Sequence, residues 1–373
     1  MPRQIEKVWI RAAPTGGMTG GVIEADVIRT RPAPSCLLCG REGRILYQGV
    51  RDRNLFVPGS WSFRVCGDCD FAWLDPHPIP EDAALAYGGR YYTHARHLEP
   101  VSLGRNPLMR ALRGAILSAR YGYTALRPKI PLANALGCLL YAIPAAHRRA
   151  TFGRLRAIPP YRPHGRLLEI GCGDGDYLLP MRELGWEIHG IEPDPQAAER
   201  AARATGATIW PGTIESAQIP EQSFDAVVAL HSIEHVYDPR LFLSRAAGFL
   251  RPGGFLYVIT PNFQGLARRL FHQDWLALDA PRHLNLLTPT SVRAICESCG
   301  LLRVRRIRTL TRRARREREH VYAVRRTGDF HSDFQPNPAQ RLALALFSLL
   351  EKIGNPLFQW GEEIELIAER RVV

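Results

Sequence analysis

The chain has 373 residues, of which 46% are hydrophobic and 23% are charged, a balance that excludes a disordered or fibrous protein. Its formal charge of +13 favours an acidic partner such as an anionic membrane or a nucleic acid. Its apolar runs are shorter than the roughly 18 residues of a membrane span, and we expect no signal peptide after Met1. Cysteine pairs spaced for metal rather than for disulfides then predict a cytoplasmic location.

Composition and motifs divide the chain into four parts. We expect an N-terminal extension over residues 1–30 and a zinc ribbon with a tyrosine-rich segment over residues 31–98. A basic apolar helical insert is expected over residues 99–160. The remainder, residues 161–373, is expected to be an α/β core that carries an insertion at about residues 311–360.

Four cysteines in the second part have the spacing of a zinc ribbon. They form two C-x2-C pairs, Cys36 with Cys39 and Cys66 with Cys69. Each pair turns tightly enough to direct two thiolates at one point, and two such pairs complete a tetrahedron. Because a closed four-thiolate shell leaves no open position, the pattern predicts a structural Zn²⁺ ion. The alternative is four unrelated buried thiols.

Residues 100–168 contain twelve basic residues and no acidic residue, so they account for most of the positive charge. The middle of this stretch, residues 131–146, is uncharged and mostly apolar. Basic residues on both sides of a short apolar run are typical of a segment in a membrane interface. We therefore expect peripheral contact with an anionic membrane surface. A helical cap with solvated arginines and a nucleic-acid surface are the alternatives.

The most specific pattern in the core is an apolar strand over residues 167–170 that leads into three alternate glycines within residues 171–175. Glycine permits the positive φ angles of a sharp turn and lets a ligand lie against the backbone. A second apolar strand over residues 188–191 ends in Glu192. A carboxylate at that place suits a ribose, because it can accept hydrogen bonds from both hydroxyls.

Further strands and helices alternate after this motif. The pair Cys296 and Cys299 lies on the apolar face of one of these helices, so we expect both thiols to pack in the core. In chain order we expect a strand over 223–230, a helix from Asp238, a strand over 255–259, a helix over 290–299, a strand over 301–310, a helix over 339–353 and a strand over 363–369.

The motifs that join these elements resemble those of the class I S-adenosylmethionine-dependent methyltransferases over about residues 160–310. The resemblance implies an α/β fold with a Rossmann-like, seven-stranded methyltransferase sheet, which the last strand would close as an antiparallel edge. The alternative is a dehydrogenase-type Rossmann domain, whose glycines usually read G-x-G-x-x-G. The matching motifs are Glu169-Ile-Gly171-Cys-Gly173-Asp-Gly175, Glu192-Pro-Asp194, Phe224-Asp225-Ala-Val-Val, Glu234-His235-Val236 and Leu250-Arg-Pro-Gly-Gly254.

The resemblance also implies where S-adenosylmethionine binds. The glycine turn would lie against the cofactor, Glu192 would hold its ribose, and residues after the third strand would flank its adenine. The implied cofactor-binding residues are Glu169, Gly171, Cys172, Gly173, Asp174, Gly175, Glu192, Pro193, Ile214, Glu215 and His231.

Two histidines are candidates for catalysis, because a hydroxyl acceptor benefits from a general base. His283 follows the fifth strand, where the acceptor pocket is expected, and His235 belongs to the Glu-His-Val motif. A structural role for both histidines is the alternative. Arg282 is a candidate to hold a phosphate or carboxylate of the substrate.

A zinc ribbon, the stretch Leu74-Asp75-Pro76 and a tyrosine-rich segment from Tyr87 to Tyr92 precede the core. This order resembles a bacterial subgroup that is often tied to cell-envelope polysaccharide or small-molecule biosynthesis. We therefore expect an enzyme that O-methylates a small molecule or a cell-envelope glycan precursor. An RNA methyltransferase that binds RNA through its ribbon and arginines, and a non-catalytic S-adenosylmethionine-binding protein, are the alternatives. The sequence leaves the oligomeric state open.

Overall fold

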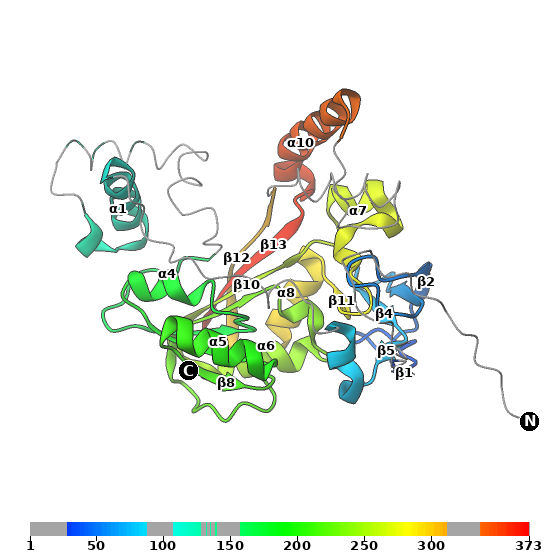
Figure 1. Cartoon of the computed structure of the whole chain (residues 1–373), viewed down its shortest axis with the longest axis horizontal. Helices are drawn as coiled ribbons and strands as arrows, with labels where there is room; N and C mark the ends of the chain where they lie inside the picture. Colours follow the sequence, from blue (N-terminus) through cyan, green and yellow to red (C-terminus); the bar gives the residue numbers. More distant parts are fainter. Residues whose placement is uncertain are drawn as a thin grey trace, which may run out of the picture.

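The computed structural model of the chain describes residues 28–87, 107–127, 157–311 and 336–372, together with residues 132, 135 and 139. An α/β core occupies the centre of the molecule, and a small N-terminal β-module lies on one side of it (Figure 1). Nearly all of the N-terminal extension, most of the basic insert and the end of the tyrosine-rich segment lie outside the described residues.

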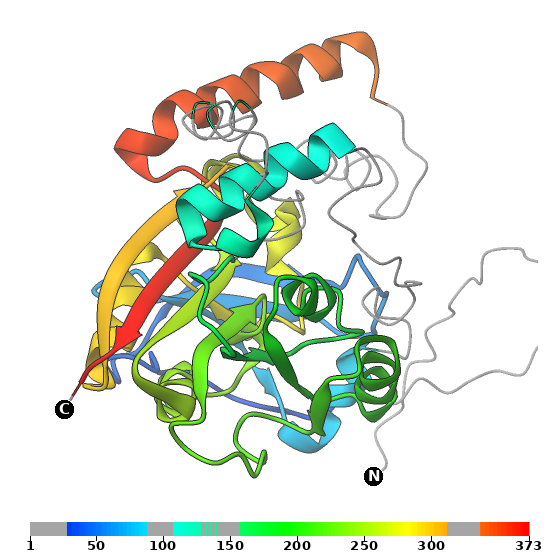
Figure 2. The same cartoon turned by 90° about the vertical axis from the view of Figure 1, so that its left-hand side faces the viewer.

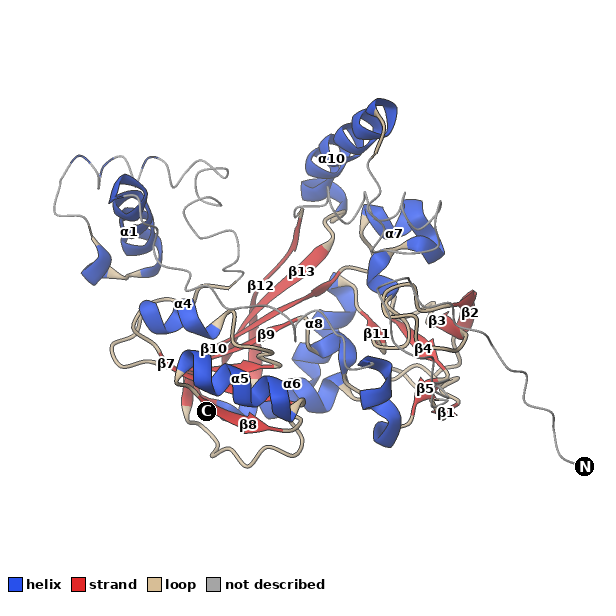
Figure 3. Cartoon of the chain, in the orientation of Figure 1, coloured by secondary structure: helices blue, strands red, loops and turns tan. Residues whose placement is uncertain are grey.

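A seven-stranded sheet with the order β12-β13-β10-β9-β6-β7-β8 forms the core (Figure 3). Five neighbouring strands, from β10 to β8, run parallel. The predicted fold class, an α/β protein with a Rossmann-like seven-stranded sheet, is confirmed. The strands are β6 (Arg166–Ile170), β7 (Glu187–Glu192), β8 (Thr208–Pro211), β9 (Phe224–Leu230), β10 (Leu250–Pro261), β12 (Leu302–Leu310) and β13 (Glu363–Arg370).

One feature of the predicted sheet is wrong. The last strand, β13, is antiparallel as expected, but it pairs with β10 on one side and with β12 on the other. The edge strand on this side is therefore β12. The burial of β13 agrees with an interior position, because Ile364, Leu366 and Ala368 are completely buried.

Alternate residues of the central strands contribute to two apolar cores on opposite faces of the sheet. On one face, Leu168 and Val227 pack with helices α6 (Pro239–Phe249) and α8 (Pro289–Ser298). On the other face, Leu167 and Ala226 pack with α4 (Leu178–Glu183) and α5 (Pro195–Thr205). The helices therefore cover both faces of the sheet, and Figure 2 shows the two layers from the side.

Helices α5 and α6 begin at aspartates that follow the carboxyl ends of β7 and β9. The side chains of Asp194 and Asp238 each accept hydrogen bonds from two backbone amides of the first turn. In both helices a proline occupies the start of the first turn, where its missing N–H is not needed. These caps fix where the chain leaves the sheet, and hence the shape of the loops at its carboxyl edge.

The N-terminal module shares its sheet with the core. Its strands β2 (Arg44–Val50), β3 (Trp61–Val65) and β4 (Ala72–Asp75) are joined by β11 (Asn285–Leu286) in the order β11-β4-β3-β2. Strand β11 directly follows the segment that contains His283. The module therefore supports one wall of the expected site. A second short ladder joins β1 (Thr30–Arg31) to β5 (His77–Pro78).

The remaining helices lie around this frame. Helix α10, which the sequence predicts over residues 339–353, extends from Pro338 to Phe358 and lies between β12 and β13 in the chain. Within the described residues, no helix combines the length and the apolar character that crossing a bilayer requires. The others are α1 (Pro107–Tyr121), α7 (Leu266–Phe271) and the 3₁₀ turns η1 (Pro80–Tyr87), η3 (Thr124–Leu126), η4 (Ile233–His235), η5 (His272–Asp274) and η6 (Leu276–Leu278).

Candidate cofactor and acceptor site

The carboxyl ends of three parallel strands meet at the centre of the sheet. Strand β6 has β7 on one side and β9 on the other, so the strand order reverses at β6. Ligands of open α/β sheets bind in the crevice at such a reversal. The site is therefore built from the loops that follow β6, β7, β9 and β10.

The loop after β6 is a turn that only glycine accommodates. Gly171, Gly173 and Gly175 have φ angles of 74°, 52° and 89°. A Cβ atom on Gly171 would lie 2.7 Å from Ser232 Oγ, and one on Gly175 would lie 2.6 Å from Thr205 Cγ2. At Gly171 and Gly175, conformation and space thus both disfavour a side chain.

Two acids flank this turn. Glu192 accepts hydrogen bonds from the amides of Gly173, at 2.7 Å, and Asp194, at 3.0 Å, so its carboxylate is fixed between the turn and the start of α5. Glu169 is buried in β6, and its Oε2 has no hydrogen-bond partner among the described residues. Burial, followed by the negative charges of Glu192 and Asp176, raises the pKa of Glu169 well above its ordinary value.

These features fit the cofactor expected from the sequence. The turn offers backbone without side chains, Glu192 is an oriented acid at the end of the neighbouring strand, and the orphaned oxygen of Glu169 is a buried polar group without a partner. A buried polar atom of this kind normally has a partner in the functional state. Gly171, Gly173, Glu192 and Glu169 would therefore hold a nucleoside at this edge of the sheet.

The other residues implied for cofactor binding have varied surroundings. Cys172 is buried and lies against Gly190 of β7, and Ile214 packs into the core beside Ile191. Asp174 forms an ion pair with Arg200 on α5, at 2.8 Å. Two of the implied residues are exposed, namely Pro193 and Glu215.

His231, at the end of β9, lies between two carboxylates. Its Nδ1 is 3.1 Å from Glu234 Oε1, and its Nε2 is 3.1 Å from Glu363 Oε1 of β13. Burial alone would lower the pKa of His231, but hydrogen bonds to the two carboxylates outweigh it and raise the pKa to about 9. His231 is therefore an imidazolium at neutral pH. Thr260 of β10 donates to the second oxygen of Glu234, at 2.9 Å.

The two predicted catalytic histidines are brought together. The rings of His235 and His283 meet edge to face, with centroids 4.7 Å apart. His283 Nδ1 donates to the carbonyl of Ala277 at 2.8 Å, and His235 Nδ1 lies 3.1 Å from the carbonyl of Arg282. Because a carbonyl can only accept, both contacts are satisfied by a proton on Nδ1, and in a neutral ring of this tautomer Nε2 carries the lone pair. Burial, followed by the neighbouring His283, lowers the pKa of His235 to about 4.

This arrangement has two chemical uses. A lone pair on Nε2 can accept a proton from a hydroxyl, or it can bind a metal ion. Glu234, His235 and His283 each offer one ligand atom, and these atoms lie within 4.8 Å of one another. Both oxygens of Glu234 already accept hydrogen bonds, from His231 and Thr260. The three groups could therefore serve in proton transfer or in metal binding.

Arg282 does not have the predicted role. Its guanidinium makes five hydrogen bonds, which go to Asp52, Asp279 and the carbonyl of Ala86, and its side chain is completely buried. A guanidinium has five N–H donors, so none remains for a phosphate or carboxylate of a substrate. The prediction is wrong because two aspartates already neutralise Arg282. Asp52 is 230 residues away in the sequence, and Asp279 lies three residues before Arg282 in a loop without a recognisable pattern.

Several residues of the site were not assigned from the sequence. Tyr87, at the end of η1, places its hydroxyl 3.1 Å from His235 Nδ1. Asp279 lies 3.8 Å from His283 Nε2, and Asp52, Thr260 and Glu363 complete the surrounding network. Of these residues, only Tyr87 lies in a segment that the sequence analysis identified, the tyrosine-rich segment from Tyr87 to Tyr92. The others are ordinary polar residues whose partners are brought together by tertiary packing alone.

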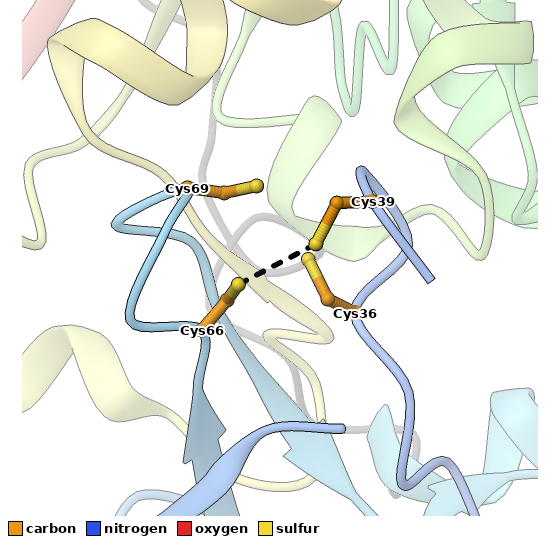
Figure 4. A group of neighbouring side chains, drawn as sticks. All are labelled: Cys36, Cys39, Cys66 and Cys69. Carbon is orange, nitrogen blue, oxygen red and sulfur yellow. Dashed lines mark hydrogen bonds between the residues drawn. The ribbon is translucent and has the colours of Figure 1, made fainter. Parts of the chain in front are cut away.

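A second candidate site lies in the N-terminal module, where the four predicted cysteines converge (Figure 4). Their sulfur atoms lie within 4.8 Å of one another, and Cys39 Sγ is 3.6 Å from Cys66 Sγ. Four thiolates about 2.3 Å from a tetrahedral Zn²⁺ would be separated by roughly 3.8 Å. The amide of Leu38 points at Cys36 Sγ, at 3.4 Å, as a thiolate acceptor requires. The four thiols therefore fit a structural zinc ion.

By contrast, Cys296 is buried on α8, as predicted, and Cys299 follows the end of that helix.

Comparisons with known proteins address the core. Residues 145–304 match a family of methyltransferase domains. Two curated relatives, from Rhizobium rhizogenes and a Methylobacterium species, are both named ubiquinone biosynthesis O-methyltransferase and are 30% and 31% identical over 147 residues. Each alignment covers 36% of this chain and 59% of the relative, so the chain spans less than two thirds of these relatives.

Solved structures also show similarity to part of the chain. One is an S-adenosylmethionine-dependent methyltransferase from Mesorhizobium loti, with 20% sequence identity and a TM-score of 0.40. The superposition covers 59% of this chain and 97% of that protein.

Proposed function

Because residues 145–304 match a family of methyltransferase domains, we propose that the protein is a class I S-adenosylmethionine-dependent methyltransferase and that it methylates a hydroxyl oxygen. The proposed acceptor is a small molecule or a cell-envelope glycan precursor. The name of the curated relatives, ubiquinone biosynthesis O-methyltransferase, supports oxygen as the methylated atom.

One observation carries this proposal. The loop that holds His235 lies beside the glycine turn, because Ser232 of that loop donates to the carbonyl of Ile170, at 2.7 Å. His283, from the loop after β10, joins it through the contact between the two rings. Nδ1 of each ring faces a backbone carbonyl, so a neutral ring protonated at Nδ1 has its lone pair on Nε2. A hydroxyl acceptor must lose its proton, and an imidazole is well suited to take it.

When bound, the cofactor supplies an activated methyl group, and the chain must align the acceptor and remove its proton. We propose that Nε2 of His283 takes this proton. The pKa of His235, lowered to about 4, makes His235 a poor proton acceptor at neutral pH. Its edge-to-face contact and its hydrogen bond to the carbonyl of Arg282 instead position His283. His231 and the carboxylates of Glu234 and Glu363 hold one another in place. These polar groups therefore need not move during the reaction.

We propose that the four cysteines of the N-terminal module bind one structural Zn²⁺ ion. The ion would fix the loops that precede β2 and follow β3. In the sheet, β3 pairs with β4 and β4 pairs with β11, which directly follows the segment that carries His283. In this proposal zinc affects catalysis only by fixing the position of the segment that carries His283.

We also propose that the basic residues of the insert, residues 100–168, bring the protein to anionic lipid. Helix α1 contributes Arg110, Arg113 and Arg120 to this segment, and the greater part of the insert lies outside the described residues.

The acceptor class can be identified with labelled cofactor. S-adenosylmethionine with an isotopic methyl group is incubated with the protein and with separate fractions of RNA, lipid-linked glycans and small metabolites. Label in the metabolite or glycan fraction, absent with His283→Ala, would support the proposal. Label in RNA would overturn the acceptor class, and cofactor binding without transfer to any fraction would overturn the enzymatic role.

A further inference from the structure

Helix α10 has apolar residues on two opposite faces. Its inner face carries Leu344, Phe347 and Gly354, all of which are buried against the rest of the protein. Phe347 stacks on Phe271 of α7 with ring centroids 5.8 Å apart, and Trp360 packs on Gly354 so closely that a Cβ atom there would clash. The inner face thus accounts for the attachment of the helix to the core.

The outer face is apolar but exposed. It consists of large residues spaced three or four apart, which is the spacing of a single helix face, and each side chain is between 52% and 77% exposed. A helix that is apolar on both sides is normally buried on both sides. The residues of this α10 outer face are Leu342, Leu346, Leu349, Leu350, Ile353 and Leu357.

Within the described part of the chain, α10 lies at the periphery of the molecule. Figures 1 and 2 both place the helix at one extremity of the molecule, next to the start of β13. Its 21 residues extend over roughly 30 Å.

The charges around the outer face identify its occupant. The exposed charged residues of α10 are Arg341 and Lys352, and its one acid, Glu351, is buried. Phe358 and Trp360 stack at the carboxyl end of the helix with centroids 4.8 Å apart, and aromatic residues favour the membrane interface. A second copy of the chain is a poor fit, because each copy carries a formal charge of +13.

We propose that the α10 outer face docks on an anionic phospholipid bilayer, with the helix lying in the interface and its leucines inserted between the lipids. An amphipathic helix with cations beside a face of leucines binds membranes in this way. Docking of α10 does not depend on the proposed methyl transfer. It would hold the protein at the membrane surface without crossing it, where lipid-linked acceptors are found.

Vesicle flotation of the full chain tests this proposal. The probes are vesicles of phosphatidylcholine with about one third phosphatidylglycerol, and vesicles of phosphatidylcholine alone. The wild type should bind the anionic vesicles. The double variant Leu346→Glu, Leu350→Glu should need roughly ten- to a hundredfold more lipid for the same bound fraction, because two side chains no longer enter the apolar layer. Lys352→Glu should weaken binding to the anionic vesicles only.

Leu241→Glu is the matched control, since Leu241 is an exposed leucine on α6, far from α10 in the sequence. It should bind vesicles as the wild type does. Titration with S-adenosylhomocysteine should give the same result for the double variant and the wild type, which separates docking from folding and from cofactor binding. Equal vesicle binding by the double variant and the wild type would overturn the proposal. So would absence of wild-type binding, or a dimer that the double variant dissociates.

Discussion

Arg282 and Asp52 form a bidentate ion pair, with N–O distances of 2.7 and 2.8 Å, in which the side chains are 0% and 1% exposed. Asp52 belongs to the loop after β2 of the N-terminal module, and Arg282 directly precedes His283. The pair therefore joins the module to the loop that carries the proposed base. A change in the structure of the module should therefore alter the position of His283 through this ion pair.

Removal of Arg282 should destabilise the protein strongly. Arg282→Ala leaves the buried carboxylates of Asp52 and Asp279 without their cation, which should lower the free energy of unfolding by about 3–5 kcal/mol. Denaturant titration measures this loss. Arg41→Ala is the control, because Arg41 pairs with Asp68 at 2.7 Å and the two side chains are 70% and 56% exposed. Its loss should be at most about 1 kcal/mol. Similar losses in the two variants would show that the buried pair does not join the module to the core.

His283→Ala should reduce kcat by roughly 10²- to 10⁴-fold, because the acceptor hydroxyl loses its proton acceptor. S-adenosylhomocysteine should bind the variant as it binds the wild type. His272→Ala is the matched control, since His272 is exposed on η5, and it should leave kcat unchanged. Turnover by His283→Ala at the wild-type rate would refute the assignment.

The pH profile separates the roles of the two histidines. If His283 is the base, His235→Ala should lower kcat but keep the acidic limb of the profile, whereas His283→Ala should lose that limb. The opposite result would assign the base to His235.

Stability should depend on pH through His231. The pKa of His231 is raised to about 9 by Glu234 and Glu363, against an ordinary value near 6.5. The imidazolium therefore stabilises the fold fully below about pH 6.5, and this stabilisation is lost as the pH rises through about 9. The Tm of the wild type should exceed that of His231→Gln at pH 6.5, and the difference should shrink by pH 9.5. A difference that stays constant or grows would contradict the charged state of His231.

The protein should contain one zinc ion per chain. Elemental analysis of the purified protein should give one equivalent, and Cys66→Ser should lose it, because the tetrahedral shell is then incomplete. Cys296→Ser, at a buried thiol on α8, should keep the full equivalent. Absence of zinc from the wild type would refute the structural ion, and two equivalents would indicate a further ion at Glu234, His235 and His283.

The parts of the fold that were predictable from the sequence are those with local signals. The parallel strands are continuous apolar runs, the helices begin at Asp-Pro caps, and the turn after β6 is marked by its glycines. Local patterns predict an antiparallel last strand but not its neighbours. The position of β13 between β10 and β12 depends on pairing between distant segments, which the sequence of β13 alone does not specify.

The site shows the same division. The glycines, Glu192 and the four cysteines were predictable because their spacing along the chain already brings them together. The network around Arg282 was not, because Asp52 lies 230 residues away and joins it only when β11 pairs with β4. An arginine beside a candidate base has the same local sequence whether it binds a substrate or a buried aspartate.

We propose that S-adenosylmethionine binds against the turn at residues 171–175. Calorimetric titration of S-adenosylhomocysteine into Gly171→Ala and Gly253→Ala tests this binding. Both glycines have nearly the same φ, 74° and 73°, so alanine introduces a similar backbone strain at each. Only at Gly171 would the new Cβ meet another atom, Ser232 Oγ at 2.7 Å, whereas nothing lies within 4 Å at Gly253.

We expect saturable binding at one site for the wild type and for Gly253→Ala, and affinity at least about tenfold weaker for Gly171→Ala, a loss of about 1.4 kcal/mol. No heat of binding with the folded wild type, or equal affinity in all three proteins, would contradict the account.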